Sequence, residues 1–264
     1  MTTRIRYLGI AAYEIVSERH RILMDPFLTG SPVAPIGPDD LEPPDVILVS
    51  HSPTDHLGDA AAIAIRTGAP VVCGTDSRAL LLERGVPAAQ IRTTVWGIQV
   101  LVGGVHVWPV ECHHWAQARL MDGSFVTGTP LGFIVEPEPG VRVYHFGDSA
   151  VFGDMRLIGQ LYRPTVGILG CTQPKSLLPL FNAGAGTVLT GEMSPDEAAL
   201  AAEFLGVRYA IGTHYVDPDD EDVHRFLSAV PKADTTGARI PLALTAGQTL
   251  VIDGDSHRIE EPAA

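Results

Sequence analysis

Residues 45–59 read Asp-Val-Ile-Leu-Val-Ser-His-Ser-Pro-Thr-Asp-His-Leu-Gly-Asp. The first five residues form an almost entirely apolar run, which is typical of a strand buried on both faces. His51, Asp55 and His56 follow that strand at once, and an Ala-rich helix is expected over 58–67. Side chains on a turn at the end of a strand are held firmly by the sheet, which suits metal coordination. The segment therefore predicts an α/β protein with a metal site at one sheet edge.

Three further strands are followed by possible metal ligands. His113 or His114 comes after a strand at 105–110, Asp148 after 142–146, and His214 after 208–212. A single histidine would mean little, but the repeated placement at strand ends indicates a shared site. Imidazole and carboxylate ligands suit zinc or manganese, with iron as a further possibility.

The rest of the chain continues the alternation of strands and helices. Gly103-Gly104 is a hairpin signal, and Ser194-Pro-Asp-Glu is a favourable helix start. No linker divides the chain, so we expect a single domain over 1–264, with a frayed polar tail at 253–264. Two halves that each mix strands and helices predict two mixed sheets face to face with helices outside. The other expected strands are 4–8, 13–16, 21–24, 70–73, 132–136 and 166–169, and the other expected helices are 77–84, 154–162, 194–205 and 221–229.

Composition narrows the classes of partner. The 264 residues carry a formal charge of −13, which argues against nucleic acid and against an anionic membrane surface. Three distant cysteines, no secretory signal and no apolar run of about 18 residues predict a reduced, cytoplasmic protein. We expect a small-molecule substrate and a homo-oligomer.

At this point the motifs resemble a known family. His51-x-x-x-Asp55-His56 with Leu-Gly-Asp after it resembles the metal-binding signature of the metallo-β-lactamase superfamily. The nearest likeness is to its small bacterial metal-dependent hydrolases related to ascorbate-6-phosphate lactonase. The resemblance covers about residues 4–230, and the motifs occur in the family's order. Supporting stretches are 7–9, 22–27, 144–148, 152–155, 193–199 and 213–215.

The resemblance implies a four-layer αβ/βα sandwich with two metal positions at the sheet edge. His51 and His113 would belong to the first position. Asp55, His56 and His214 would belong to the second, and Asp148 would bridge the two. Asp55 and Asp148 are the expected catalytic carboxylates, with Asp55 as a candidate proton shuttle.

The chain departs from the family pattern at Pro53. The family signature is His-x-His-x-Asp-His, and proline offers no ligand atom where the second histidine is expected. Three outcomes remain open: one metal in the second position, two metals with His114 or water filling the gap, or a binding role without hydrolysis.

Weaker candidates surround this set. Asp25 is expected either to orient a ligand histidine or to cap a turn before Pro26. Lys175 lies in an apolar stretch at 172–193 that could be a lid, a pocket wall or an oligomer contact. Tyr215 could donate a hydrogen bond to a developing oxyanion, although core packing is equally consistent with its position.

The sequence thus predicts a metal-dependent hydrolase that uses metal-activated water to open an ester, lactone or amide of a small polar metabolite. A phosphodiesterase of the same fold is the alternative among enzymes, and the charge of −13 disfavours a polyanionic substrate. The alternative outside enzymes is a non-catalytic metal- or metabolite-binding protein, which Pro53 motivates.

Overall fold

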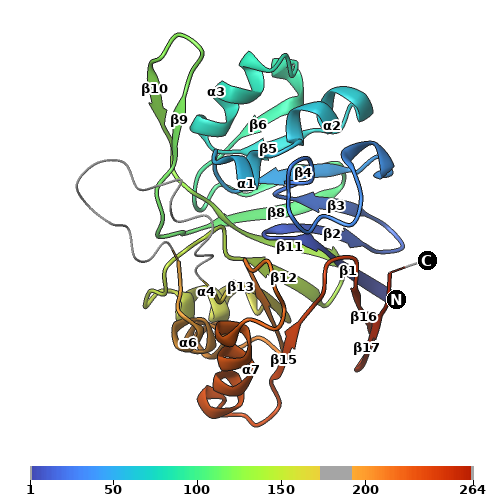
Figure 1. Ribbon diagram of the computed structural model, residues 1–264, viewed down its shortest axis with the longest axis vertical. Helices are drawn as coiled ribbons and strands as arrows, with labels where there is room; N and C mark the ends of the chain where they lie inside the picture. Colours follow the sequence, from blue (N-terminus) through green and yellow to red (C-terminus); the bar gives the residue numbers. More distant parts are fainter. Residues whose placement is uncertain (1, 173–191, 263–264) are drawn as a thin grey trace.

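Two mixed β-sheets pack face to face, with helices covering their outer faces (Figure 1). The computed structural model describes residues 2–172 and 192–262. Helices α2 and α3 lie on the outer side of one sheet, and α4, α6 and α7 lie on the outer side of the other. The predicted four-layer αβ/βα sandwich is confirmed.

The first sheet contains both ends of the described chain. Its strands β3 to β6 run parallel, whereas the remaining pairs are antiparallel. Helices α1 (Thr54–Leu57), α2 (Ala60–Thr67) and α3 (Thr75–Glu83) connect the parallel strands, together with the short 3-10 turns at Pro38–Asp40 and Ala88–Gln90. Across the sheet the order is β17 (Ser256–Glu260), β16 (Thr249–Asp253), β1 (Thr2–Gly9), β2 (Ala12–Val16), β3 (Arg21–Met24), β4 (Val46–Val49), β5 (Val71–Cys73) and β6 (Ile91–Thr93).

The second sheet has the same mixed character. Strands β12 to β15 are parallel, and β11, β8 and β7 add to them in antiparallel fashion. Its outer helices are α4 (Met155–Tyr162), α6 (Pro195–Leu205) and α7 (Glu221–Ala233). Across this sheet the order is β15 (Ile240–Ala243), β14 (Tyr209–Thr213), β13 (Val166–Gly170), β12 (Val141–His145), β11 (Gly132–Glu138), β8 (Val105–Val110) and β7 (Val100–Val102).

Side-chain alternation assigns each central strand to two cores. In β3, Ile22 and Met24 face the second sheet, whereas Leu23 packs under the helices. In β4, Val46 and Leu48 point inward in the same way, and Ile47 packs outward. Because successive residues of a strand point to opposite faces, a strand covered on both sides must be apolar throughout. This explains the run that opens at residue 45.

The carboxyl ends of the parallel strands place the polar turns together. Asp25 follows β3, Ser50 and His51 follow β4, Asp148 follows β12 and His214 follows β14. Parallel neighbours end at the same edge of a sheet, so side chains from distant parts of the chain converge there. The predicted location at strand ends therefore has a direct topological cause.

Several local expectations need correction. The polar tail does not simply fray, because residues 256–260 form β17 against β16. The helix expected over 58–67 is α2, which begins at Ala60, and a separate short helix, α1, precedes it over Thr54–Leu57. A hairpin of β9 (Gln117–Arg119) and β10 (Phe125–Thr127) was not predicted, since its short strands are mostly exposed and lack an apolar alternation. No helix within the described ranges is both long and apolar enough to cross a membrane.

Candidate metal centre

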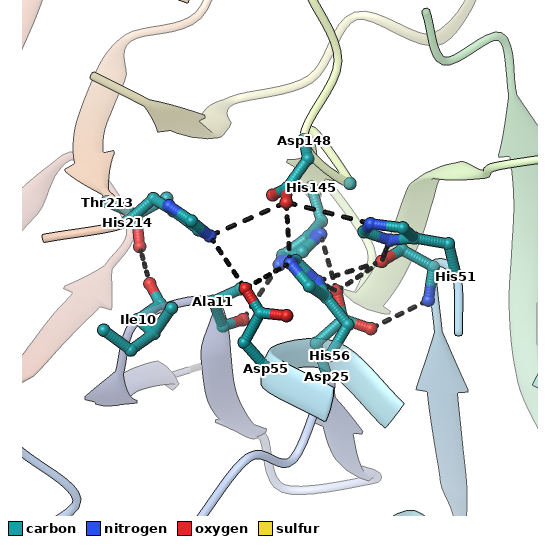
Figure 2. A network of polar contacts seen from close by, with 12 residues as sticks. Ile10, Ala11, Asp25, His51, Asp55, His56, His145, Asp148, Thr213 and His214 are labelled. Carbon is teal, nitrogen blue, oxygen red and sulfur yellow. Dashed lines mark hydrogen bonds and ion pairs between the residues drawn. The ribbon is translucent and has the colours of Figure 1, made fainter. Parts of the chain in front are cut away.

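Four side chains converge at the edge where the two sheets meet (Figure 2). One ligand atom from each of Asp55, His56, Asp148 and His214 lies within 4.8 Å of the others. Oδ2 of Asp148 is 2.8 Å from His56 Nε2 and 3.6 Å from His214 Nε2. Oδ2 of Asp55 is 3.8 Å from His56 Nε2 and 3.6 Å from His214 Nε2. We call this set the four-residue position.

A second group shares Asp148 with the first. His51, His114 and Asp148 also offer ligand atoms within 4.8 Å of one another. The Nε2 atom of His51 lies 3.8 Å from Asp148 Oδ2, and the rings of His51 and His114 meet edge to face at 4.9 Å. We call this set the three-residue position. Asp148 belongs to both sets and would be the shared ligand if each set held an ion, which is the role that the family resemblance implies for it.

Outer hydrogen bonds turn the histidines toward the cluster. Asp25 Oδ2 lies 2.8 Å from Nδ1 of His56, and Asp25 also accepts from the backbone and hydroxyl of Ser50, at 2.8 and 2.7 Å. Ser50 Oγ is 2.9 Å from Nδ1 of His51. Because that hydroxyl donates to Asp25, it accepts from His51, which places the His51 proton on Nδ1. Asp25 thus has the orienting position expected as one of its two alternatives.

Two outer contacts were missed by the sequence reasoning. Ser50 was treated only as the end of a strand, although its hydroxyl links Asp25 to His51. Glu192 lies with Oε2 3.1 Å from His214 Nδ1, and its side chain is only 7% exposed. Glu192 lies just before α6 and is distant in sequence from the other ligand candidates. No spacing pattern in the sequence therefore indicates it.

The Leu-Gly-Asp part of the motif builds the turn. Gly58 has φ 40°, and a Cβ there would lie 2.4 Å from the carbonyl oxygen of Pro26. The Asp59 carboxylate accepts from the backbone N–H groups of Leu28 and Thr29, at 3.0 and 2.8 Å. These contacts fix the loop after β3 against α1. The motif therefore supports the site without contributing a ligand.

Carboxylates dominate the electrostatics of the four-residue position. Burial opposes a charged His56, but the nearby Asp148 carboxylate raises its pKa well above the usual range. Burial also opposes a charged His214, yet Glu192 and Asp148 raise its pKa to about 9. Burial would raise the pKa of Asp148, but His56 and His214 hold it well below its usual value. For Asp55 the same balance between burial and the two imidazoles lowers the pKa to about 2.

The three-residue position is electrostatically different. Burial and the neighbouring His56 lower the pKa of His51 to about 3. Burial lowers the pKa of His114 as well. These two imidazoles are therefore neutral at neutral pH, and each keeps a lone pair on one ring nitrogen. Neutral imidazole is the form that binds a metal ion.

The residues present fit a divalent metal ion. Ligands at 2.0–2.2 Å from a tetrahedral ion stand about 3.3–3.6 Å apart, close to several separations in the four-residue position. Within residues 2–172 and 192–262, the buried Nε2 atoms of His51 and His214 and Oδ1 of Asp148 have no hydrogen-bond partner. Buried polar atoms seldom lack a hydrogen-bond partner, and a bound cation would give all three of these atoms a partner.

The backbone is strained at the same place. Asp25, Asp148 and His214 have φ values of 42°, 66° and 68°, in the left-handed region that costs an L-residue about 1–2 kcal/mol. Ile10, whose carbonyl accepts the His214 N–H at 3.0 Å, has φ 53°. Such strain persists only where surrounding structure enforces it, and it concentrates at functional sites.

Two of the predicted residues lie outside the cluster. His113 points away from the cluster: its Nε2 lies 2.8 Å from Glu111, and its half-exposed ring stacks on Phe152. His114, the neighbouring candidate, is the one near His51. The Tyr215 hydroxyl donates to the Leu244 carbonyl at 2.7 Å and is buried, which agrees with core packing rather than with an oxyanion donor. Lys175 lies outside the described residues.

Comparison with known proteins identifies the family. A family model described as "Beta-lactamase superfamily domain" matches residues 20–215, which include the whole cluster. The chain belongs to the β-lactamase superfamily. Within this superfamily, a protein of Rubrobacter xylanophilus named "UPF0173 metal-dependent hydrolase" is 40% identical over 81% of this chain and 81% of its own length. A protein of Thermococcus onnurineus with the same name is 39% identical over 80% of this chain and 84% of its own.

Solved structures support the fold of this superfamily member. Igni18 from Ignicoccus hospitalis, described as a novel metallo hydrolase, aligns with a TM-score of 0.72. The alignment covers 96% of this chain and 99% of that one, at 23% sequence identity. At this identity the likeness concerns the fold alone, and the fold is that of the metallo-β-lactamase sandwich.

Proposed function

We propose that this protein is a metal-dependent hydrolase that opens an ester, lactone or amide of a small polar metabolite. The convergence of Asp55, His56, Asp148 and His214 on one buried point carries the proposal. Zinc or manganese suits two carboxylates and two imidazoles, and iron is a further possibility. The names of the relatives support hydrolysis with a metal, and the lactonase resemblance supports a lactone or ester.

When bound, a divalent ion would lower the pKa of a water molecule toward about 7 and polarise a carbonyl oxygen. The chain itself supplies a nearly closed cluster: the side chains of His56, His214 and Asp148 are 0%, 3% and 5% exposed. Asp55 is the most exposed of the four at 15%, and it faces His56 and His214 through Oδ2. Its other oxygen can exchange a proton with substrate or solvent, which suits the shuttle role.

The number of metal ions follows from the ligand count. We propose one resident ion in the four-residue position, because the three-residue position lacks the histidine that the family pattern places at Pro53. Pro53 also motivates the second candidate, a metal- or metabolite-binding protein without hydrolytic activity. A phosphodiester substrate is disfavoured by the formal charge of −13.

Elemental analysis and a substrate screen test the proposal together. Purified protein is expected to bind one divalent ion per chain and to hydrolyse members of an ester, lactone and amide panel, with phosphodiesters included for comparison. Asp148→Ala and His214→Ala should abolish the activity, whereas His224→Ala, on the exposed face of α7, should leave it unchanged. Hydrolysis that survives both site substitutions would overturn the catalytic assignment. Metal binding with no hydrolysis of the panel would favour the binding protein.

A further inference from the structure

The Glu192 carboxylate lies on the outer side of the His214 ring. Its Oε2 is 3.1 Å from His214 Nδ1, while Nε2 of the same ring points toward Asp55 and Asp148, at 3.6 Å from each. One imidazole is therefore held between a carboxylate outside the cluster and two inside it. Within the cluster, the ion pair of Glu192 is with His214, on the side of the ring opposite Asp55 and Asp148.

The fold provides a specific space for this carboxylate. A Cβ at Gly170, the last residue of β13, would lie 3.2 Å from Glu192 Oε2 and 2.2 Å from the Phe146 ring. Glycine at this position leaves room for both groups, so the carboxylate fits between the strand end and His214. The Glu192 side chain is 7% exposed. Burial raises the pKa of Glu192 well above its usual range, and the His214 imidazole is the main group that opposes this shift.

The backbone of His214 is held independently of its ring. Its N–H donates to the Ile10 carbonyl at 3.0 Å, and its carbonyl accepts from the Thr172 hydroxyl. These bonds fix the position of the residue but leave the side-chain torsions and the tautomer undetermined. Glu192 Oε2 lies 3.1 Å from Nδ1, so in the neutral ring a proton on Nδ1 would face this carboxylate and leave the Nε2 lone pair directed at the cluster.

A second histidine of the cluster, His56, also has a carboxylate beside its Nδ1 atom. Asp25 Oδ2 lies 2.8 Å from Nδ1 of His56, and Glu192 Oε2 lies 3.1 Å from Nδ1 of His214. At His51 the corresponding partner is a neutral hydroxyl, Ser50. Both histidines of the four-residue position therefore have an outer carboxylate, and such a carboxylate increases the basicity of a ligating imidazole.

We propose that Glu192 is a positioning residue that fixes the ring of His214 and strengthens metal binding at the four-residue position. This inference rests on the proposed function only in requiring that the cluster binds a metal ion. Hydrolysis itself is not required. The competing role is purely structural: Glu192 would anchor the chain just before α6, and its loss would then lower stability without a specific effect on the metal.

Zinc affinity separates the two roles. Competition with a chromophoric chelator is used to measure the dissociation constant of wild type, Glu192→Ala and Glu192→Gln. Loss of an outer partner weakens binding about 10–100-fold, which we expect for Glu192→Ala. Glu192→Gln should lie between this variant and wild type, since the amide keeps an oxygen facing Nδ1 but loses the negative charge. If circular dichroism shows that Glu192→Ala does not fold, the zinc affinity of the nearly isosteric Glu192→Gln variant distinguishes the two roles.

Glu197→Gln is the matched control. Glu197 lies on the same segment and loses the same charge, but its carboxylate closes the capping box with Ser194 instead of touching a histidine. This variant should lower thermal stability and leave zinc affinity unchanged. The absorption spectrum of the cobalt-substituted protein gives a second reading, because a reoriented His214 would alter the ligand-field bands.

Two results would overturn the inference: wild-type zinc affinity in both Glu192 variants, or an equal loss of affinity in Glu197→Gln. A wild-type protein that takes up no divalent ion would contradict the proposed function itself. Metal binding without hydrolysis, combined with weaker binding in Glu192→Ala, would support the inference while the hydrolase proposal fails. The two failures are therefore distinguishable.

Discussion

The four-residue position and the three-residue position share one carboxylate and differ in almost everything else. The first has two aspartates and two histidines, and each of those histidines has a carboxylate on its outer side. The second has Asp148 and two histidines, and the outer partner of His51 is the Ser50 hydroxyl. Pro53 occupies the place where the family pattern would add a third imidazole.

This difference shows how the surroundings of a metal position set its affinity. Each nearby carboxylate attracts a divalent ion by Coulomb forces that are strong in a buried site. The four-residue position has two carboxylates among its ligands and two more behind them, whereas the three-residue position has only the shared one. We therefore expect the positions to fill in order, the four-residue position first.

Asp148→Ala should have the largest effect, because it removes the ligand that both positions share. We expect metal affinity to fall by more than about 100-fold at each, beyond the loss caused by removing an outer partner. Equilibrium dialysis with zinc measures this directly. Asp148→Asn serves as the comparison of similar shape, and it should retain more affinity than alanine does. Retention of one ion with wild-type affinity in Asp148→Ala would show that Asp148 is not shared.

Two single substitutions should separate the positions. His214→Ala removes a ligand from the four-residue position only. The affinity of that position for its metal ion should therefore fall by more than about 100-fold. His51→Ala removes a ligand from the three-residue position only and should leave one tightly bound ion. The stoichiometry and affinity of zinc in the two variants provide the test. If His51→Ala loses the tight ion and His214→Ala keeps it, the order of filling proposed here is reversed.

Proton release should differ between the two positions. In the metal-free protein the pKa of His214 is about 9, so at pH 7 a metal ion must displace its proton. Affinity at the four-residue position should therefore rise by about tenfold or more per pH unit from 7 to 9. The pKa of His51 is about 3, so this residue adds no pH dependence in that range. Calorimetry in buffers of different ionisation enthalpy counts the protons, and equal counts in His51→Ala and His214→Ala would contradict this difference.

Much of the fold was predictable because its signals are local. The apolar run before Ser50 predicted a strand buried on both faces, and the helix expected over 194–205 is α6, with Ser194 as its N-cap. The hairpin of β9 and β10 was missed because its strands are short and exposed. Strand β17 was missed because a polar strand at a sheet edge has the composition of a tail.

The candidate site was predictable as a set of strand ends but not as a set of contacts. His51, Asp55, His56, Asp148 and His214 were predicted, and the structure brings them together. The choice between His113 and His114 was not settled by sequence, since adjacent residues point to different sides and the strand ends just before them. Glu192 reaches His214 only through the tertiary packing of two distant segments.

Pro53→His should have the smallest effect, and it tests why the two positions differ. Pro53 is the N-cap residue of α1, and its carbonyl accepts from the N–H groups of His56 and Leu57, at 3.1 and 2.9 Å. Histidine can adopt its φ of −55° and ψ of 156° and keep those bonds, while adding the ligand that the family pattern places there. We expect the weaker ion to bind about tenfold more tightly and the stoichiometry to approach two.

Pro53→Ala is the necessary control, because either substitution makes the unfolded chain more flexible and lowers stability by up to about 1 kcal/mol. Only the imidazole distinguishes the two variants, so any difference between them in metal content arises from a ligand. If both bind the same number of ions as wild type, an existing group such as His114 already completes the three-residue position. In that case the weaker binding expected there would follow from its single carboxylate rather than from Pro53.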